Sequence, residues 1–149
     1  LAPPSHLSVL GTSLFSCQSL SHHRHLHSFP TRRSPDLISY TRSDDGASLS
    51  FTIDEHHLNG DGFIHGGMMM TLASGVLGEL ARATADGAPT APLSVNCDFV
   101  GPGPKGAAVV GTATITRRTR TVLFTSAELR ADDKLMMTAT GVYRIGEAS

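Results

Sequence analysis

A glycine-rich turn that runs directly into an apolar helix is the part of the sequence best suited to chemistry. Residues 59–74 read NGDGFIHGGMMMTLAS. Backbone N–H groups at a helix start have no partners within the helix, and the helix dipole adds roughly half a positive charge there. Because Gly66 and Gly67 carry no side chain, a carbonyl oxygen can approach these amides and its developing charge can be stabilised. The alternative is that the glycines only form a tight turn and that His65 caps the helix or packs against it.

A long helix over residues 65–85 is predicted to position this turn. Its apolar residues recur at helical spacing and are Met69, Leu72, Ala73, Val76 and Leu80. Its polar line is Glu79, Arg82 and Asp86. Since the remaining residues are small or apolar, we expect a sheet to surround the helix on most sides. Gly75 and Gly78 each cost about 1 kcal/mol relative to alanine in a helix, so we expect another backbone to approach closely there.

Strand patterns on both sides of the helix predict one curved antiparallel sheet. Residues 38–42 and 49–53 flank a turn at residues 43–46. Four later segments are rich in β-branched residues: 93–100, 107–117, 121–130 and 134–145. Short connections at 118–120 and 131–133 indicate neighbouring hairpins. The predicted fold class is therefore α+β, with one long central helix wrapped by an antiparallel sheet of five to six strands.

The turn resembles the motif of hotdog-fold acyl-CoA thioesterases of the phenylacetate-pathway (PaaI-like) type. That motif is Asn-x-x-Gly-x-x-His-Gly-Gly followed by a helix, and Asn59, Gly62, His65, Gly66 and Gly67 match it in register. Residues 96–102 and 117–121 agree as well, so the resemblance spans about residues 38–146. It implies a hotdog fold, hydrolysis of an acyl-CoA thioester to free acid and CoA without a cofactor, and a homodimer or homotetramer with sites built from two subunits.

The resemblance also implies roles for single residues of the turn. The Gly66 amide would polarise the thioester carbonyl, and Asn59 would position water or the carbonyl. His65 would orient the loop and its hydrogen bonds. The leaving thiolate needs little acid assistance, because thiols ionise with a pKa of about 8.5. The demanding step is therefore the delivery of an activated water.

Ser74 departs from the family pattern, which has Asp or Glu nine residues after the histidine to activate water. An unassisted serine hydroxyl is a poor base, and Gly78 stands where some relatives carry a second hydroxyl. Asp61, Glu79 and His57 are the alternative acids or bases, although Glu79 lies about 140° around the helix from Ser74. Three hypotheses follow: a thioesterase, a catalytically impaired protein that binds acyl-CoA, and a hotdog dehydratase or hydratase.

Substrate binding is assigned to residues beside the turn and to a basic hairpin. These residues are Gly67, Met68, Arg117, Arg118 and Arg120. The three arginines would hold the phosphates of CoA, and the alternative is an ordinary solvated turn. Residues 68–70 form a methionine run that could line an acyl pocket but is more typical of core packing. Cys97 is interpreted as a small buried hydrophobe.

Composition excludes several classes of protein. The 149 residues carry 12 Lys+Arg and 13 Asp+Glu, a net charge of −1, so neither nucleic acid nor an anionic membrane is an expected partner. No apolar run reaches the roughly 18 residues that cross a bilayer. Cys17 and Cys97 lie far apart without metal-ligand spacing, which predicts neither a disulfide framework nor a metal site. A reducing cytoplasm is the expected location.

The first 37 residues are expected to be non-globular and to stand apart from a domain over residues 38–149. They hold 8 serines, 4 prolines and 5 histidines but a single acidic residue. Residues 27–37 resemble the translation of a sequencing adapter, so we interpret residues 1–37 as not native, with an organellar presequence as the alternative. The histidines at positions 22, 23, 25 and 27 are typical of an adventitious metal site.

Overall fold

The structure is a computed structural model that describes residues 38–43 and 46–147. The predictions for residues 1–37, including the histidine cluster, lie outside these described residues. The elements in chain order are β1 (Ser39–Ser43), β2 (Gly46–Thr52), the 3-10 helix η1 (Glu55–His57), α1 (Gly66–Thr84), β3 (Thr90–Phe99), β4 (Ala108–Arg118), β5 (Val122–Ala131) and β6 (Lys134–Ile145). The predicted strands and helix are therefore confirmed to within a few residues, while η1 was not predicted.

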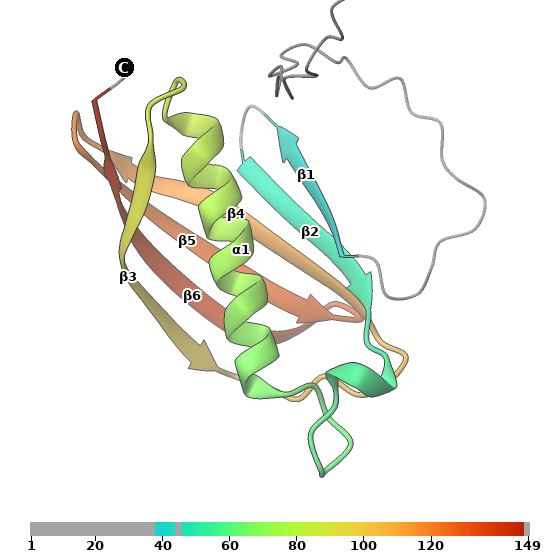
Figure 1. The fold of residues 1–149 in the computed structure, drawn as a ribbon. Helices are drawn as coiled ribbons and strands as arrows, with labels where there is room; N and C mark the ends of the chain where they lie inside the picture. Colours follow the sequence, from blue (N-terminus) through green and yellow to red (C-terminus); the bar gives the residue numbers. More distant parts are fainter. Residues whose placement is uncertain (1–37, 44–45, 148–149) are drawn as a thin grey trace, which may run out of the picture. The chain divides into compact units, whose positions relative to one another are not determined.

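The six strands form one sheet in the order β1-β2-β4-β5-β6-β3, and every pairing is antiparallel (Figure 1). Hairpins join β4 to β5 and β5 to β6, as the short connections predicted. Because α1 connects β2 to β3, the chain crosses the sheet and adds β3 at the far edge beside β6. The predicted α+β class, with one long helix and an antiparallel sheet, is confirmed.

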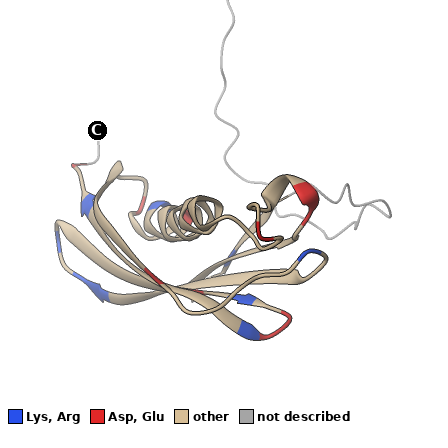
Figure 2. Ribbon diagram, turned by 90° about the horizontal axis from the view of Figure 1, so that it is seen from below, with Lys and Arg blue, Asp and Glu red and all other residues tan. Residues whose placement is uncertain are grey.

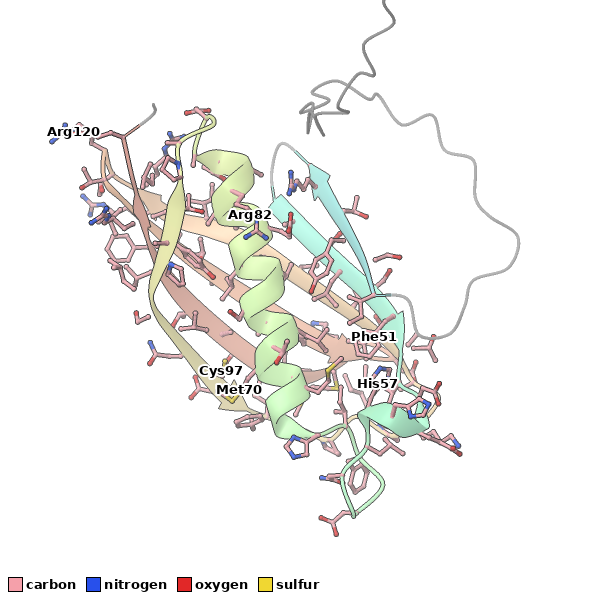
Figure 3. The ribbon with its side chains drawn as sticks, viewed as in Figure 1. Phe51, His57, Met70, Arg82, Cys97 and Arg120 are labelled. Atoms are coloured by element: carbon pink, nitrogen blue, oxygen red, sulfur yellow. The ribbon has the colours of Figure 1, made fainter. Side chains whose placement is uncertain are left out.

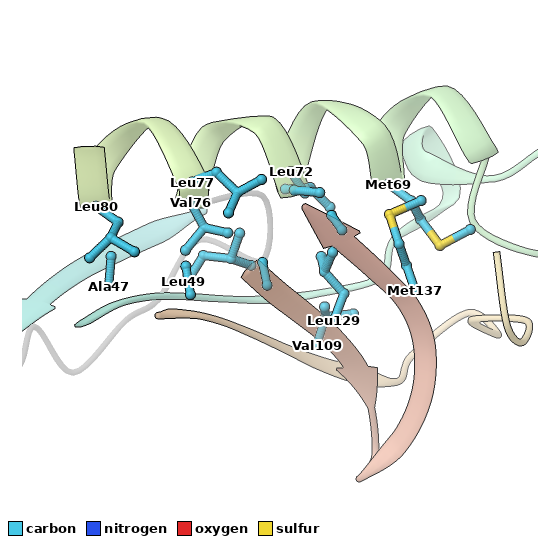
Figure 4. Packing of buried hydrophobic residues seen from close by; sticks show 14 of the residues in the cluster. Ala47, Leu49, Met69, Leu72, Val76, Leu77, Leu80, Val109, Leu129 and Met137 are labelled. Atoms are coloured by element: carbon cyan, nitrogen blue, oxygen red, sulfur yellow. The ribbon is translucent and has the colours of Figure 1, made fainter. Parts of the chain in front are cut away.

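One face of α1 packs against the concave side of the curved sheet (Figure 2). Its buried residues are Met69, Leu72, Ala73, Val76, Leu77, Gly78, Leu80 and Ala81. Figure 4 shows the labelled side chains of this face, from Met69 to Leu80, on the side of the helix that faces Leu49, Val109, Leu129 and Met137 of the sheet. Each fully buried side chain of this size contributes about 1.5–3 kcal/mol through removal of apolar surface from water. This packing fixes where the start of the helix lies.

The opposite side of α1 is uncovered, which corrects the expectation that the sheet surrounds the helix on most sides. Thr71, Ser74 and Arg82 are exposed on this side, and Met70 is 47% exposed. The neighbouring edge strand β3 is also largely exposed, with Leu93 at 60%. Both α1 and β3 therefore carry an exposed apolar side chain on adjacent surfaces.

The two helix glycines do not meet another backbone, which corrects a second expectation. A Cβ atom on Gly75 would collide with the phenol oxygen of Tyr40, so the close neighbour is a side chain of β1. At Gly78 the nearest atom to such a Cβ is Nη1 of Arg82, at 3.5 Å, an ordinary contact. The glycines therefore make room for Tyr40 on one side and for the arginine on the other.

Candidate active site

The loop before the helix is held together by the side chain of Asn59. Its Oδ1 accepts hydrogen bonds from the amides of Asp61 (2.9 Å) and Phe63 (3.2 Å), and its own amide donates to the Phe63 carbonyl (2.8 Å). Gly62 has a φ of 81°, a backbone conformation that favours glycine. The residue types of the motif thus close a tight loop. The Nδ2 group of Asn59 has no acceptor among the described residues and can still donate.

His65 caps the helix, and in doing so leaves one backbone amide unused. Its Nδ1 accepts from the Gly67 amide (2.9 Å), and its carbonyl accepts from the amides of Met68 (2.9 Å) and Met69 (3.1 Å). The Gly66 amide has no acceptor among the residues that the structure describes. The cap that sequence analysis gave as an alternative is therefore present, and it leaves Gly66 as the free donor at the positive end of the helix.

Phe99, a residue that the sequence analysis did not single out, covers Gly66. A Cβ atom on Gly66 would lie 3.2 Å from Cε1 of Phe99, so the ring already occupies the space beside this backbone. Phe99 is the last residue of β3 and is 56% exposed. Its only signal in the sequence is its position in residues 96–102, which share in the family resemblance. The end of the edge strand thus forms one wall beside the free amide.

A groove of about 520 Å³ runs along the uncovered side of α1, between the helix and β3. Its lining residues are Met70, Thr71, Ser74, Gly75, Gly78, Arg82, Val95 and Cys97. Figure 3 shows Met70 and Cys97 together near the first turns of the helix, with Arg82 further along it. Ser74 is exposed, and its carbonyl accepts a long hydrogen bond from the Tyr143 hydroxyl at 3.5 Å. The groove therefore presents Ser74 among mostly uncharged neighbours.

The methionine run divides between the two positions considered for it, the core and the groove, and Cys97 is less buried than expected. Met69 is buried in the core, and Met68 packs partly against it, whereas Met70 lines the groove. Cys97 is half-buried rather than fully buried. Burial and the nearby charge of Asp98 raise the pKa of its thiol, which lowers its reactivity because the thiolate is the nucleophile.

Ser74 and the free Gly66 amide of the same chain do not come together. They are eight positions apart on one helix, which corresponds to about 12 Å along its axis. Asp61 lies exposed in the loop. His57 is occupied, because its Nδ1 accepts from the Asp54 amide (2.9 Å) and its ring stands edge-on to another ring, that of Phe51. His57 therefore caps η1 and packs, and this geometry does not favour it as a general base.

Glu79, the other alternative base, is held by two arginines. Its carboxylate accepts from Arg42 of β1 (2.8 Å, from Nε) and forms an ion pair with Arg82. Partial burial acts to raise the pKa of Glu79, but the hydrogen bonds and charges of Arg42 and Arg82 outweigh it and lower the pKa below its ordinary value. A carboxylate with a lowered pKa is a weaker base. Glu79 therefore serves structure rather than water activation.

Replacing Glu79 by glutamine is expected to lower the free energy of unfolding by about 0.5–1 kcal/mol at pH 7. Because the pKa of Glu79 is lower in the folded state, its contribution is complete above the unfolded pKa and disappears as pH falls through the folded value. Urea unfolding of the native chain and Glu79→Gln at pH 7 and toward pH 3 measures this. Glu128→Gln is the control, because Glu128 forms an exposed ion pair with Arg130. Its free energy of unfolding should differ little from that of the native chain at either pH. If Glu79→Gln lowered the free energy of unfolding by the same amount at both pH values, the stabilising role assigned to the ionised Glu79 would be contradicted.

The basic hairpin lies at the other end of the helix from Gly66. Arg117 and Arg118 end β4, and Arg118 forms an ion pair with Asp86 just beyond the helix C-terminus (2.7 Å). A helix of the length of α1, 19 residues, spans about 28 Å. Figure 3 shows Arg120 at this far end. One chain therefore does not bring the three arginines to its own Gly66 amide.

The described part of the chain lacks two further classes of feature. Residues 38–43 and 46–147 contain no group of three or more His, Cys, Asp or Glu side chains placed to hold a metal ion. Among the helices of these residues, none combines the length and the apolar character that a membrane crossing requires.

Comparison with known families shows to which family this chain belongs. Residues 54–144 match the model of the family described as the acyl-CoA thioesterase N-terminal domain. The match covers more than half of the chain and includes the glycine-rich loop, α1 and most of the sheet. The chain belongs to the acyl-CoA thioesterase family. The thioesterase hydrolyses an acyl-CoA thioester, as the motif resemblance implied, and the match lends no support to a catalytically impaired binder.

Individual relatives agree with this assignment. Human acyl-coenzyme A thioesterase 13 is 29% identical over 96 residues, which cover 63% of this chain and 69% of that protein. A phenylacetic acid degradation-related protein from Ralstonia eutropha is 29% identical with a TM-score of 0.67, covering 72% of this chain and 84% of that one. A hypothetical thioesterase from Streptococcus pneumoniae, solved with coenzyme A, is 16% identical with a TM-score of 0.69 over 76% and 93%. The hotdog fold of this thioesterase is confirmed.

Proposed function

We propose that this thioesterase uses the Gly66 amide to polarise the thioester carbonyl of acyl-CoA. The observation that carries the proposal is that the amides of Gly67, Met68 and Met69 are all bonded to His65. Among the backbone amides of this first helical turn, Gly66 is the one left to donate to a substrate oxygen. Asn59 and His65 hold the loop in this form. A fixed donor at a helix start stabilises an oxyanion because it needs no reorganisation during the reaction.

In the proposed reaction, water attacks the carbonyl carbon and the negative charge develops on the oxygen bonded to Gly66. The C–S bond then breaks, CoA leaves as a thiolate that takes up the proton lost by the water, and the free acid is released. The thiolate is a good leaving group because thiol pKa values lie near about 8.5. We assign the positioning of the attacking water to the Ser74 hydroxyl, which is exposed in the groove.

The site requires two chains, because Ser74 cannot reach the Gly66 amide of its own helix. We propose that a second copy pairs along β3, an edge strand with the exposed side chain of Leu93. A two-fold interface places the same patch of both copies in contact. The groove and Ser74 of one chain then face the helix start of the other. Two such dimers can form the homotetramer that the resemblance also allows.

Substrate binding in this proposal is shared between the chains. The acyl group lies in the groove beside Met70, and Gly67 and Met68 line the space around the reacting carbonyl. Arg117, Arg118 and Arg120 bind the phosphates of CoA whose thioester lies at the helix start of the partner. The coenzyme A in the Streptococcus pneumoniae neighbour supports a CoA-binding role for this fold.

We further propose a cytoplasmic location and a domain that begins near residue 38. Two cysteines far apart in the chain, without ligand spacing, are typical of a reducing compartment. The start of the family match at residue 54 and of β1 at Ser39 supports the domain boundary.

Leu93→Lys tests the two-chain site. A charge on the β3 edge opposes strand pairing between copies, so the variant is expected to sediment as a single chain and to lose hydrolysis in parallel. Val110→Lys is the matched control, because Val110 is an exposed apolar residue of β4, outside this interface. It should keep both the assembly and the activity. A single-chain Leu93→Lys variant with native activity would contradict the proposal.

A further inference from the structure

We infer that Arg82 binds an anionic group of the thioester substrate inside the groove. The inference rests on the proposed function, because it assumes that the groove holds substrate. Arg82 is the one charged residue among those that line the groove. The other lining side chains are neutral: Met70, Thr71, Ser74, Gly75, Gly78, Val95 and Cys97. A single cation in such a setting is a candidate determinant of specificity.

The arginine is folded back along the helix toward Ser74. Nη1 and Nη2 of Arg82 lie 3.5 Å and 3.8 Å from the place where a Cβ atom on Gly78 would stand. The hydroxyl of Tyr143 lies 3.8 Å from the same place and donates to the Ser74 carbonyl. The guanidinium therefore lies over bare backbone one helical turn from Ser74, on the uncovered side of α1 (Figure 3).

The charge of Arg82 is only partly compensated. Its Nη2 donates to Glu79, but the same carboxylate also pairs with Arg42. Two guanidinium groups thus share one carboxylate, which leaves a net charge of about +1 on the cluster at neutral pH. Nη1 of Arg82 has no hydrogen-bond acceptor among the described residues. A second chain that covers the groove would bury this charge at a cost unless an anion met it.

Arginine suits carboxylate and phosphate groups because its planar fork can donate two parallel hydrogen bonds. One turn of helix separates Gly78 from Ser74, about 6 Å along the axis. That spacing fits a carboxylate at the end of a short acyl chain whose thioester lies at Ser74. A phosphate of CoA is the other anion that the substrate carries. Both present the same chemistry to Arg82, and different substrates distinguish them.

The test compares four thioesters: glutaryl and valeryl groups, each on CoA and on N-acetylcysteamine, which has no phosphates. For an acyl carboxylate, Arg82→Gln should lower kcat/KM for both glutaryl thioesters by about 10- to 100-fold and leave the valeryl thioesters nearly unchanged. For a CoA phosphate, it should lower kcat/KM for both CoA thioesters and for neither N-acetylcysteamine thioester. Either pattern supports the inference and names the anion.

Arg42→Gln is the matched control, because it removes the other arginine of Glu79 without touching the groove. If Arg82→Gln alters no substrate more than Arg42→Gln does, Arg82 is only an ion-pair partner of Glu79 and the inference is overturned. Hydrolysis of valeryl-CoA by the native chain tests the proposed function separately. If the native chain hydrolyses thioesters but Arg82→Gln leaves every kcat/KM unchanged, only the inference is rejected. If the native chain hydrolyses none of the thioesters, the proposed function is rejected.

Discussion

Gly66→Val is expected to lower kcat for acyl-CoA hydrolysis by about 100- to 1000-fold, the effect of losing one oxyanion donor. A Cβ atom added at Gly66 would lie 3.2 Å from the Phe99 ring. The two further methyl groups of valine would displace the ring or block the approach of a carbonyl to the amide. Free-thiol release from acyl-CoA measures the loss, and circular dichroism confirms that the variant is folded.

Gly60→Ala is the control for this variant. Gly60 belongs to the same loop, but a Cβ atom there would meet no atom within 4 Å, so activity should stay within about two-fold of native, as for most surface substitutions. A folded Gly66→Val chain that retained native kcat would show that another group polarises the carbonyl.

Ser74→Asp is expected to raise thioester hydrolysis about 100-fold or more, because a positioned general base contributes about 10²–10⁴ to a rate. The side chain is exposed in the groove, so an aspartate fits without displacing core residues. The positive charge of Arg82, one turn further along the helix, favours the ionised carboxylate that removes a proton from water. Steady-state thiol release by both chains gives the ratio.

Ser74→Asn is the control that separates the effect of adding a base from the effect of changing the shape of the side chain. Asparagine has nearly the same size as aspartate but cannot accept a proton, so its rate should not exceed that of the native chain. A folded Ser74→Asp chain with no gain over Ser74→Asn would show that Ser74 does not lie beside the attacking water. The base would then be sought in the second chain of the assembly.

The local features of the fold could be predicted from the sequence because they depend on neighbouring residues. The apolar spacing from Met69 to Leu80 predicted α1, and the short connection at residues 131–133 predicted the β5–β6 hairpin. The motif also located the helix start, where His65 and Gly66 now lie as cap and free donor. What these predictions share is that a few consecutive residues determine each of them.

Features that depend on distant residues could not be predicted in this way. The sequence left Glu79 as an alternative base, but in the fold its carboxylate pairs with Arg42 of β1. Phe99 reaches Gly66 only because β3 joins the far edge of the sheet. In each case the partner lies in an element whose place is set by the sheet order rather than by local sequence.

The side of α1 that carries Ser74 shows another limit of prediction from the sequence. Its small and apolar residues predicted burial, yet one chain leaves this side uncovered. In the proposed two-chain site a second copy covers this side, and a sequence pattern does not distinguish burial within a chain from burial between chains. The small and apolar helix residues on this side, such as Met70, Ser74 and Gly75, are among those that line the groove.

The most direct test of the account is free-thiol release by the chain of residues 1–149 from short-chain, long-chain and aromatic acyl-CoAs, carried out in ¹⁸O-labelled water. We expect release of CoA with one labelled oxygen in the acid product for at least one acyl class, and loss of this release in Gly66→Val. Binding of the same acyl-CoAs in calorimetry without release of thiol from any of them would contradict the account and identify a protein that holds acyl-CoA without hydrolysing it.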